Sequence, residues 1–92
     1  MIIVSQDKGK IINFDNMTRV YIVFYEGDDD VCIRTETVDS LYEDLGYYKT
    51  EARAKEVLQE IEKKICEGSN IKMDIEGINY EVSKQIYQMP ER

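Results

Sequence analysis

Clustered carboxylates are the first feature of this sequence that could do chemistry. The run EGDDD at positions 26–30 places four acids within five residues, and hard cations such as Ca²⁺ bind clustered carboxylate oxygens. An EF-hand loop begun at Asp28 would need glycine at its sixth position and glutamate at its twelfth. This chain has Ile33 and Asp39 there. We therefore predict no metal site and no cofactor, and interpret the run as the solvated tip of a hairpin.

The residues needed for common catalytic sites are missing. The chain contains no histidine, so no Ser-His or Cys-His pair is available. Cys32 and Cys66 are far apart and form no CxxC motif, which favours small buried residues over zinc or redox chemistry. No glycine-rich phosphate loop is present, and a domain this small seldom encloses the cleft that a pair of catalytic carboxylates requires. We predict that the protein is not an enzyme.

The distribution of charge is more informative than its total. Residues 26–44 hold eight acids and one base, Arg34, a net charge of −7 (1 − 8) that equals the −7 of the whole chain. The other residues therefore carry eleven acids (19 − 8) and eleven bases (12 − 1). A concentrated negative field steers a basic partner and repels phosphate. The stretch predicts binding to a basic protein surface and argues against direct binding to nucleic acid.

Tyrosines near these acids sharpen this prediction, because tyrosine is favoured in binding hot spots. The alternative is a patch that only increases solubility. The predicted partner-binding residues are Glu26, Asp28, Asp29, Asp30, Tyr42, Glu43, Asp44 and Tyr47.

Short strands dominate the first half of the chain. Alternating apolar residues and turn signals predict antiparallel strands at 2–4, 11–14, 19–25 and 31–36. Both faces of 19–25 are apolar or aromatic, so we expect this strand in the middle of the sheet. Residues 37–49 fit either a short helical turn or another strand, and we favour a strand at about 45–49.

One long helix is predicted after these strands. Thr50 suits the N-cap and Gly68 the C-terminal end. One apolar stripe is formed at three- and four-residue spacing by Ala54, Val57, Leu58, Ile61 and Ile65. A hairpin at 71–82 and a last edge segment at 86–90 complete a single domain spanning 1–92. The predicted class is α+β: an antiparallel meander packed on one amphipathic helix, followed by a C-terminal β-hairpin.

Three stretches carry a resemblance to known proteins: "MIIVSQDK" with "IINFDN", then "LGYYKTEARAKEVLQEI", then "YQMPE". Over about half of the chain, they resemble a group of small, largely uncharacterised proteins of Gram-positive bacteria and their phages and prophages. Ala52 stands where the group's pattern has a second glutamate. The resemblance implies a phage or prophage context and supplies no site residues. Small accessory proteins of phages often block a host defence protein.

These observations lead us to expect a cytoplasmic, non-enzymatic binding protein. We expect its acidic stretch to dock on a basic surface of a host nucleic-acid-processing or defence protein, as an anti-defence inhibitor of the anti-CRISPR type would. The alternative is a structural protein that forms a homo-oligomer through an exposed strand, such as "KQIYQMP" at 84–90.

Overall fold

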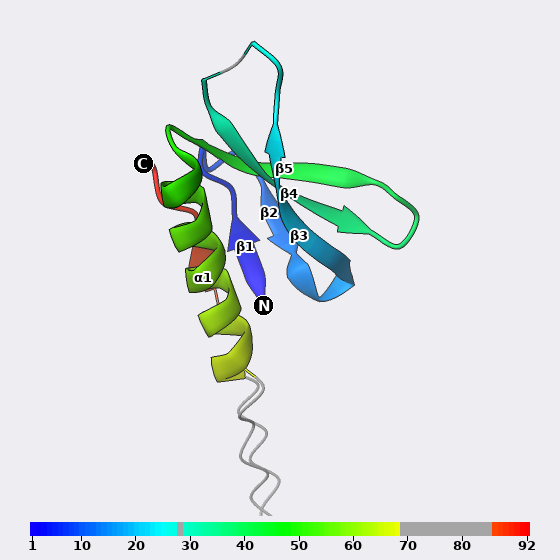
Figure 1. Ribbon diagram of the computed structural model, residues 1–92. Helices are drawn as coiled ribbons and strands as arrows, with labels where there is room; N and C mark the ends of the chain where they lie inside the picture. The colour runs from blue at the N-terminus through cyan, green and yellow to red at the C-terminus, as the bar shows by residue number, and fades with distance from the viewer. Residues whose placement is uncertain (28, 69–85) are drawn as a thin grey trace, which may run out of the picture.

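The computed structural model describes residues 1–27, 29–68 and 86–92 and combines a long helix with two three-stranded sheets (Figure 1). The predicted α+β class is confirmed. Sheet A contains β1 (Ile2–Val4), β2 (Ile11–Asn13) and β6 (Ile86–Gln88). Sheet B contains β3 (Met17–Phe24), β4 (Val31–Thr37) and β5 (Tyr42–Tyr48). The predicted hairpin at 71–82 lies outside the described residues.

Sheet B is an antiparallel meander in the order β3-β4-β5. The segment whose structure was ambiguous in the sequence forms β5, which begins at Tyr42, earlier than predicted. Backbone hydrogen bonds from Thr37 to Leu41 (2.8 Å) and from Ser40 to Thr37 (3.1 Å) close the turn between β4 and β5. A local β-turn therefore takes the place of the alternative helical turn.

The prediction that β3 lies in the middle of its sheet is wrong, because β3 is an edge strand of sheet B. A 3₁₀ turn, η1 (Phe14–Asn16), separates β2 from β3. The Asn13 side chain accepts a hydrogen bond from the Asp15 backbone N–H (3.2 Å) where this turn begins. β2 pairs with β1 instead. Among the described residues, no strand covers the outer edge of β3.

Sheet A joins the two ends of the described chain. β2 runs antiparallel to β1, and β6 runs parallel to β1 on its other side. Asp7 shapes the turn between β1 and β2, because its Oδ1 accepts hydrogen bonds from Ser5 Oγ (2.7 Å) and the Gly9 backbone N–H (2.9 Å). The predicted edge segment before Pro90 is confirmed as β6, which lies at the margin of the sheet.

The helix α1 (Glu51–Gly68) begins where the sequence predicts. Thr50 Oγ1 accepts a hydrogen bond from the Arg53 backbone N–H (3.1 Å), the interaction expected of an N-cap. Ala54, Val57 and Ile61 are fully buried against both sheets, whereas Ile65 is exposed. The shared core contains Ile3, Ile12, Val31, Ile33, Leu45, Tyr48, Ala54, Val57, Ile61, Tyr87 and Met89. The helix found here is not apolar enough to cross a membrane.

Candidate interaction surface

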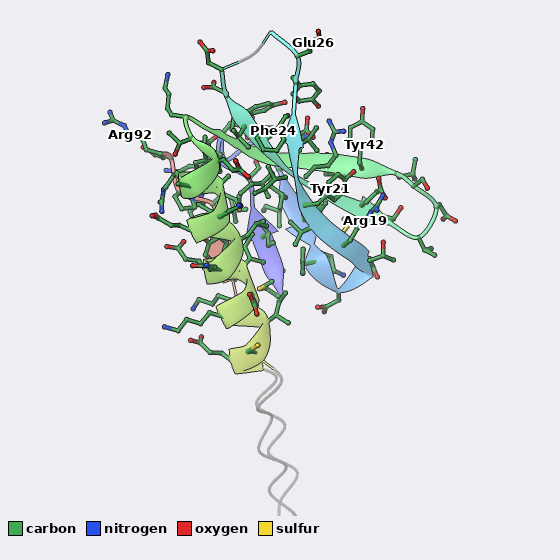
Figure 2. All side chains as sticks on the ribbon, viewed as in Figure 1. Arg19, Tyr21, Phe24, Glu26, Tyr42 and Arg92 are labelled. Atoms are coloured by element: carbon green, nitrogen blue, oxygen red, sulfur yellow. The ribbon has the colours of Figure 1, made fainter. Side chains whose placement is uncertain are left out.

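Four tyrosines surround one arginine on sheet B. Tyr21 pairs with Arg34 and Tyr47 pairs with Cys32 across the strands, so these side chains share the face of sheet B opposite the buried Ile33. A register shift between Ile33 and Arg34 lets β5 bury Leu45 on the core side, although Tyr47 two residues later lies on the outer face. Tyr42 and Tyr47 remain 56% and 43% exposed, and Figure 2 labels Tyr21 and Tyr42 on this sheet. We call the group the tyrosine face and define it as Tyr21, Tyr25, Arg34, Tyr42 and Tyr47.

Arg34 lies at the centre of the tyrosine face. Its Nε donates to Asp44 Oδ1 at 2.7 Å, and its guanidinium also donates to the Tyr25 hydroxyl. The Cζ atom lies 4.0 Å from the ring centroid of Tyr42 and 5.5 Å from that of Tyr25, within the range of cation–π attraction. The hydrogen bond to Asp44 raises the pKa of Arg34 above its usual value, so Arg34 stays charged.

Asp44 stays ionised because of its two donors. Burial by itself would raise the pKa of Asp44, but the hydrogen bonds from Arg34 and Tyr47 outweigh it and hold this pKa below its usual value. The Tyr47 hydroxyl donates to Asp44 Oδ2 at 2.9 Å, and this bond raises the pKa of Tyr47. A buried thiol lies beside them, since Cys32 pairs with Tyr47 across the strands.

A second charged pair extends this network to the edge of the sheet. Arg19 Nη2 lies 2.6 Å from Glu36 Oε2, and its guanidinium lies 4.8 Å from the Tyr21 ring centroid. The Tyr21 hydroxyl donates to Glu36 Oε1 at 2.9 Å. The hydrogen bonds from Tyr21 and Arg19 lower the pKa of Glu36. Arg19 and Arg34 are both neutralised by neighbouring carboxylates, so this face has no spare cation for a phosphate group.

The acids of residues 26–44 fall into two groups, those that form an ion pair and those that do not. Glu36 pairs with Arg19, Asp44 with Arg34, and Glu43 with Lys10 (2.8 Å). In the described part of the chain no ion pair is formed by Glu26, Asp29, Asp30 or Asp39. The uncompensated charge is therefore concentrated at the two turns of sheet B.

Most of that charge lies at the end of the β3–β4 hairpin, where Figure 2 labels Glu26. We call Glu26, Asp29 and Asp30 the acidic tip; Asp28, also predicted for the site, is not among the described residues. Phe24 is 61% exposed beside the tip. Tyr47 pairs with Cys32 near this end of the sheet, while Tyr42 pairs with Glu36 at the far end. The predicted residues thus form an elongated surface rather than one compact patch.

Sequence reasoning missed four residues of this surface: Tyr21, Phe24, Tyr25 and Arg34. Phe24 was expected in a central strand, where both faces would be covered. The period-two alternation of residues 19–25 places both tyrosines, Tyr21 and Tyr25, on one face of the strand together with Val23. With Arg34 as the one base of the acidic stretch, that alternation was the available signal for the tyrosine face.

Two surface hollows are lined by described residues. A hollow of about 200 Å³ lies at the junction of the sheets and is lined in part by Ser5, Asp7 and Lys10. Ser5 is buried and donates to Asp7. The hydrogen bonds from Ser5 and from the Gly9 backbone lower the pKa of Asp7, which makes this carboxylate a weak base. These hydrogen bonds hold Ser5 and Asp7 in the turn between β1 and β2.

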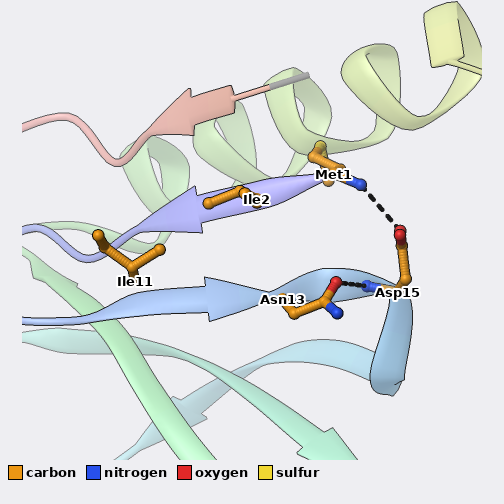
Figure 3. A pocket seen from close by; sticks show the side chains of 5 residues that line it. All are labelled: Met1, Ile2, Ile11, Asn13 and Asp15. Carbon is orange, nitrogen blue, oxygen red and sulfur yellow. Dashed lines mark hydrogen bonds and ion pairs between the residues drawn. The ribbon is translucent and has the colours of Figure 1, made fainter. Parts of the chain in front are cut away.

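A second hollow, of about 290 Å³, is lined by Met1, Ile2, Ile11, Asn13 and Asp15 (Figure 3). The Met1 ammonium donates to Asp15 Oδ1 at 2.8 Å at its rim. Within the described residues, no three metal-ligating side chains gather in either hollow or elsewhere.

Comparison of the chain with protein-family models, curated proteins and solved structures finds no match. The resemblance to small phage proteins therefore stays a prediction, and the proposal that follows is argued from the surface itself.

Proposed function

We propose that this protein is a non-enzymatic binding module that docks on a basic surface of another protein. The observation that carries the proposal is the acidic tip, which has no ion pair among the described residues and lies beside exposed Phe24. Carboxylates without local counterions keep their field for an incoming partner. Glu26, Asp29 and Asp30 are therefore proposed to contact lysine or arginine side chains of the partner.

The tyrosine face supplies the second half of the proposed contact. Tyrosine rings give a large, rigid contact area at low entropic cost, and tyrosine and arginine are enriched in hot spots. Hydrogen bonds to Asp44 and Glu36 already fix the Tyr47 and Tyr21 hydroxyls. A partner therefore meets a preorganised surface, which reduces the entropic cost of binding.

The charge arrangement favours a basic protein over a nucleic acid. Phosphate binding requires cations that can release counterions. Arg19 and Arg34 already pair with carboxylates, and the neighbouring acidic tip repels phosphate. A host nucleic-acid-processing or defence protein, whose own basic groove would be covered, is a partner class that agrees with the phage-like resemblance.

The test is affinity capture with three baits from a lysate of a Gram-positive bacterium, at low and moderate salt. The baits are the wild type, Asp28→Asn/Asp29→Asn/Asp30→Asn, and Glu51→Gln/Glu56→Gln/Glu62→Gln. Both variants change the net charge by +3, but the second alters only exposed positions of α1. We expect the wild type and the α1 variant to retain one basic protein that the tip variant loses. Equal retention by all three baits would remove the proposal.

The aromatic part of the contact is tested separately on the purified pair with Phe24→Ala, beside the acidic tip, and Tyr42→Ala, in the tyrosine face. We expect each substitution to weaken binding by about tenfold or more while the salt dependence stays that of the wild type. An unchanged affinity for both variants would confine the contact to the acidic tip.

A further inference from the structure

The outer edge of β3 has the composition of an interior strand. Six of the eight residues of β3 are apolar or aromatic, and the other two are Thr18 and Arg19. Edge strands usually carry lysine, proline, inward-pointing charges or a covering segment that prevents pairing with another chain. β3 contains no proline, no lysine and no acid, and Arg19 is its one charge. The sequence of β3 therefore lacks the residues that keep a solitary edge from pairing, and the register shift in its pairing with β4 is confined to the end of the strand, between Met17 and Arg19.

We propose that this edge pairs with β3 of a second copy of the chain, in antiparallel orientation. The two copies of sheet B then form one continuous six-stranded sheet, three strands from each copy. The pairing is a two-fold symmetric contact in which the same strand is used on both sides. This inference does not rest on the proposed function, because the groups that pair are the backbone N–H and C=O groups of β3 and no heterologous partner is involved.

The residues of β3 are less buried than those of β4, as expected if the outer edge of β3 is uncovered. No residue of β3 is buried, whereas Val31, Cys32, Ile33 and Thr35 of the neighbouring β4 are. Val20 and Ile22 reach the core only in part. A second β3 beside this strand would cover the sides of these residues that α1 and β4 leave open.

The other edges of the described sheets are poorer sites for strand addition. β2 and β6 are only three residues long. On the outer side of β5, Gln6 occupies the backbone groups, since its N–H donates to Leu45 O (2.8 Å) and its side chain bonds to Tyr47. The segment 84–90 was the alternative site for forming a homo-oligomer. Its residues Tyr87 and Met89 are buried, so their side chains do not contribute to a contact with a second copy. β3 is the longest strand described, at eight residues.

The negative charge of the acidic tips favours the antiparallel over the parallel orientation of the two β3 strands. In a parallel pair the two acidic tips would lie side by side and repel one another. In an antiparallel pair they lie at opposite ends of the seam, about 26 Å or more apart for a strand of eight residues. The Arg19–Glu36 pair of each copy then lies at the end of the seam nearer the partner's acidic tip, and its Arg19 side chain is still 63% exposed.

The first test measures the mass in solution of the wild type and of two Val→Lys variants by sedimentation equilibrium, at protein concentrations of about 50 µM and on either side of it. Val23 lies within β3, and Val38 is 80% exposed in the turn between β4 and β5. We expect the wild type and Val38→Lys to have twice the chain mass. Val23→Lys places like charges at the seam, so we expect it to raise the dimer dissociation constant at least about tenfold. A monomeric wild type, or equal dimerisation by all three proteins, would overturn the proposal.

A second measurement uses the wild type and does not depend on how a variant folds. We expect amide hydrogen exchange of residues 17–24 to slow as protein concentration rises, while exchange at residues 42–48 stays constant. Exchange in β3 that is independent of concentration would contradict a β3 seam.

Orientation is tested with spin labels placed at Asp29→Cys in a Cys66→Ser background. Antiparallel pairing predicts a separation beyond about 26 Å, whereas a parallel pair would hold the labels within about 15 Å. The shorter separation would overturn the antiparallel arrangement.

Discussion

The side-chain amide of Gln6 pairs with the backbone of Tyr47 in the way a neighbouring strand would. The Tyr47 N–H donates to Gln6 Oε1 at 2.7 Å, and Gln6 Nε2 donates to Tyr47 O at 2.7 Å. The same Nε2 also donates to the Glu91 carbonyl at 3.0 Å. One side chain therefore joins the end of β1, the edge of β5 and the last residues of the chain.

Replacing Gln6 with alanine should lower the free energy of unfolding by about 1–3 kcal/mol, because three hydrogen bonds to backbone groups are lost together. The matched control is Gln59→Ala on the exposed side of α1, which we expect to stay within about 0.5 kcal/mol of the wild type. Chemical denaturation measures both changes. Equal stability of the two variants would show that water replaces the Gln6 amide without cost.

Two isoleucines on α1 provide a matched test of the core. Ile61 is fully buried and Ile65 is 44% exposed. Ile61→Ala should cost about 2–5 kcal/mol through lost burial and the cavity left behind, and Ile65→Ala less than half as much. The comparison uses thermal and denaturant unfolding of both variants. A larger loss for Ile65→Ala would mean that α1 is rotated relative to the sheets.

The Arg34–Asp44 pair should make stability depend on acid pH. The folded-state pKa of Asp44 is lowered, so the pair stabilises fully above the unfolded value of about 3.9 and is lost as pH falls through the folded value. The melting temperature of Asp44→Asn should therefore lie below that of the wild type near neutral pH, and the difference should shrink in acid. Asp39→Asn, in the exposed β4–β5 turn, is the control and should follow the wild-type curve. A wild-type advantage that persists below about pH 2 would contradict this assignment.

The two thiols should differ sharply in reactivity. Burial raises the pKa of the Cys32 thiol to about 11, and Cys32 is fully buried while Cys66 is exposed near the end of α1. A thiol reagent should therefore label one cysteine per native chain and two per unfolded chain. Cys66→Ser should abolish the native reaction, whereas Cys32→Ser should leave it unchanged. Rapid native labelling of Cys32 would show that β4 opens easily.

The local elements of this fold and the β3-β4-β5 meander are predictable from sequence, whereas the division of the strands between two sheets is not. The Thr50 cap, the apolar stripe of α1 and the alternation in β4 each depend on nearby residues. The cap is found, the stripe is buried except at its exposed end, Ile65, and the alternation holds from Ile33 onward, whereas Cys32 is buried on the other face. The edge position of β3 depends on whether residues 14–16 continue a hairpin or turn away. A short turn held by Asn13 decides this, and no periodicity extends across it.

The candidate site could likewise be predicted from the sequence only in part. The excess of acid in residues 26–44 is visible in the sequence, but its neutralisation is not, because Lys10 and Arg19 come from outside that stretch. Cross-strand pairing brings Arg19 to Glu36, and Lys10 reaches Glu43 from the turn between β1 and β2. The acidic tip is left without a cation among the described residues. The sequence could indicate the amount of charge, and only the register of the strands shows where it remains uncompensated.

The parallel pairing of β1 with β6 also constrains the order of folding. Ile3 is paired with Tyr87, 84 positions later in the chain (87 − 3), so this contact carries a large loop-closure cost. The β3–β4 and β4–β5 hairpins need only neighbouring residues and are able to form while the chain is still being synthesised. β1 leaves the ribosome before β6 and must wait for it, so sheet A is completed only after translation has passed residue 88.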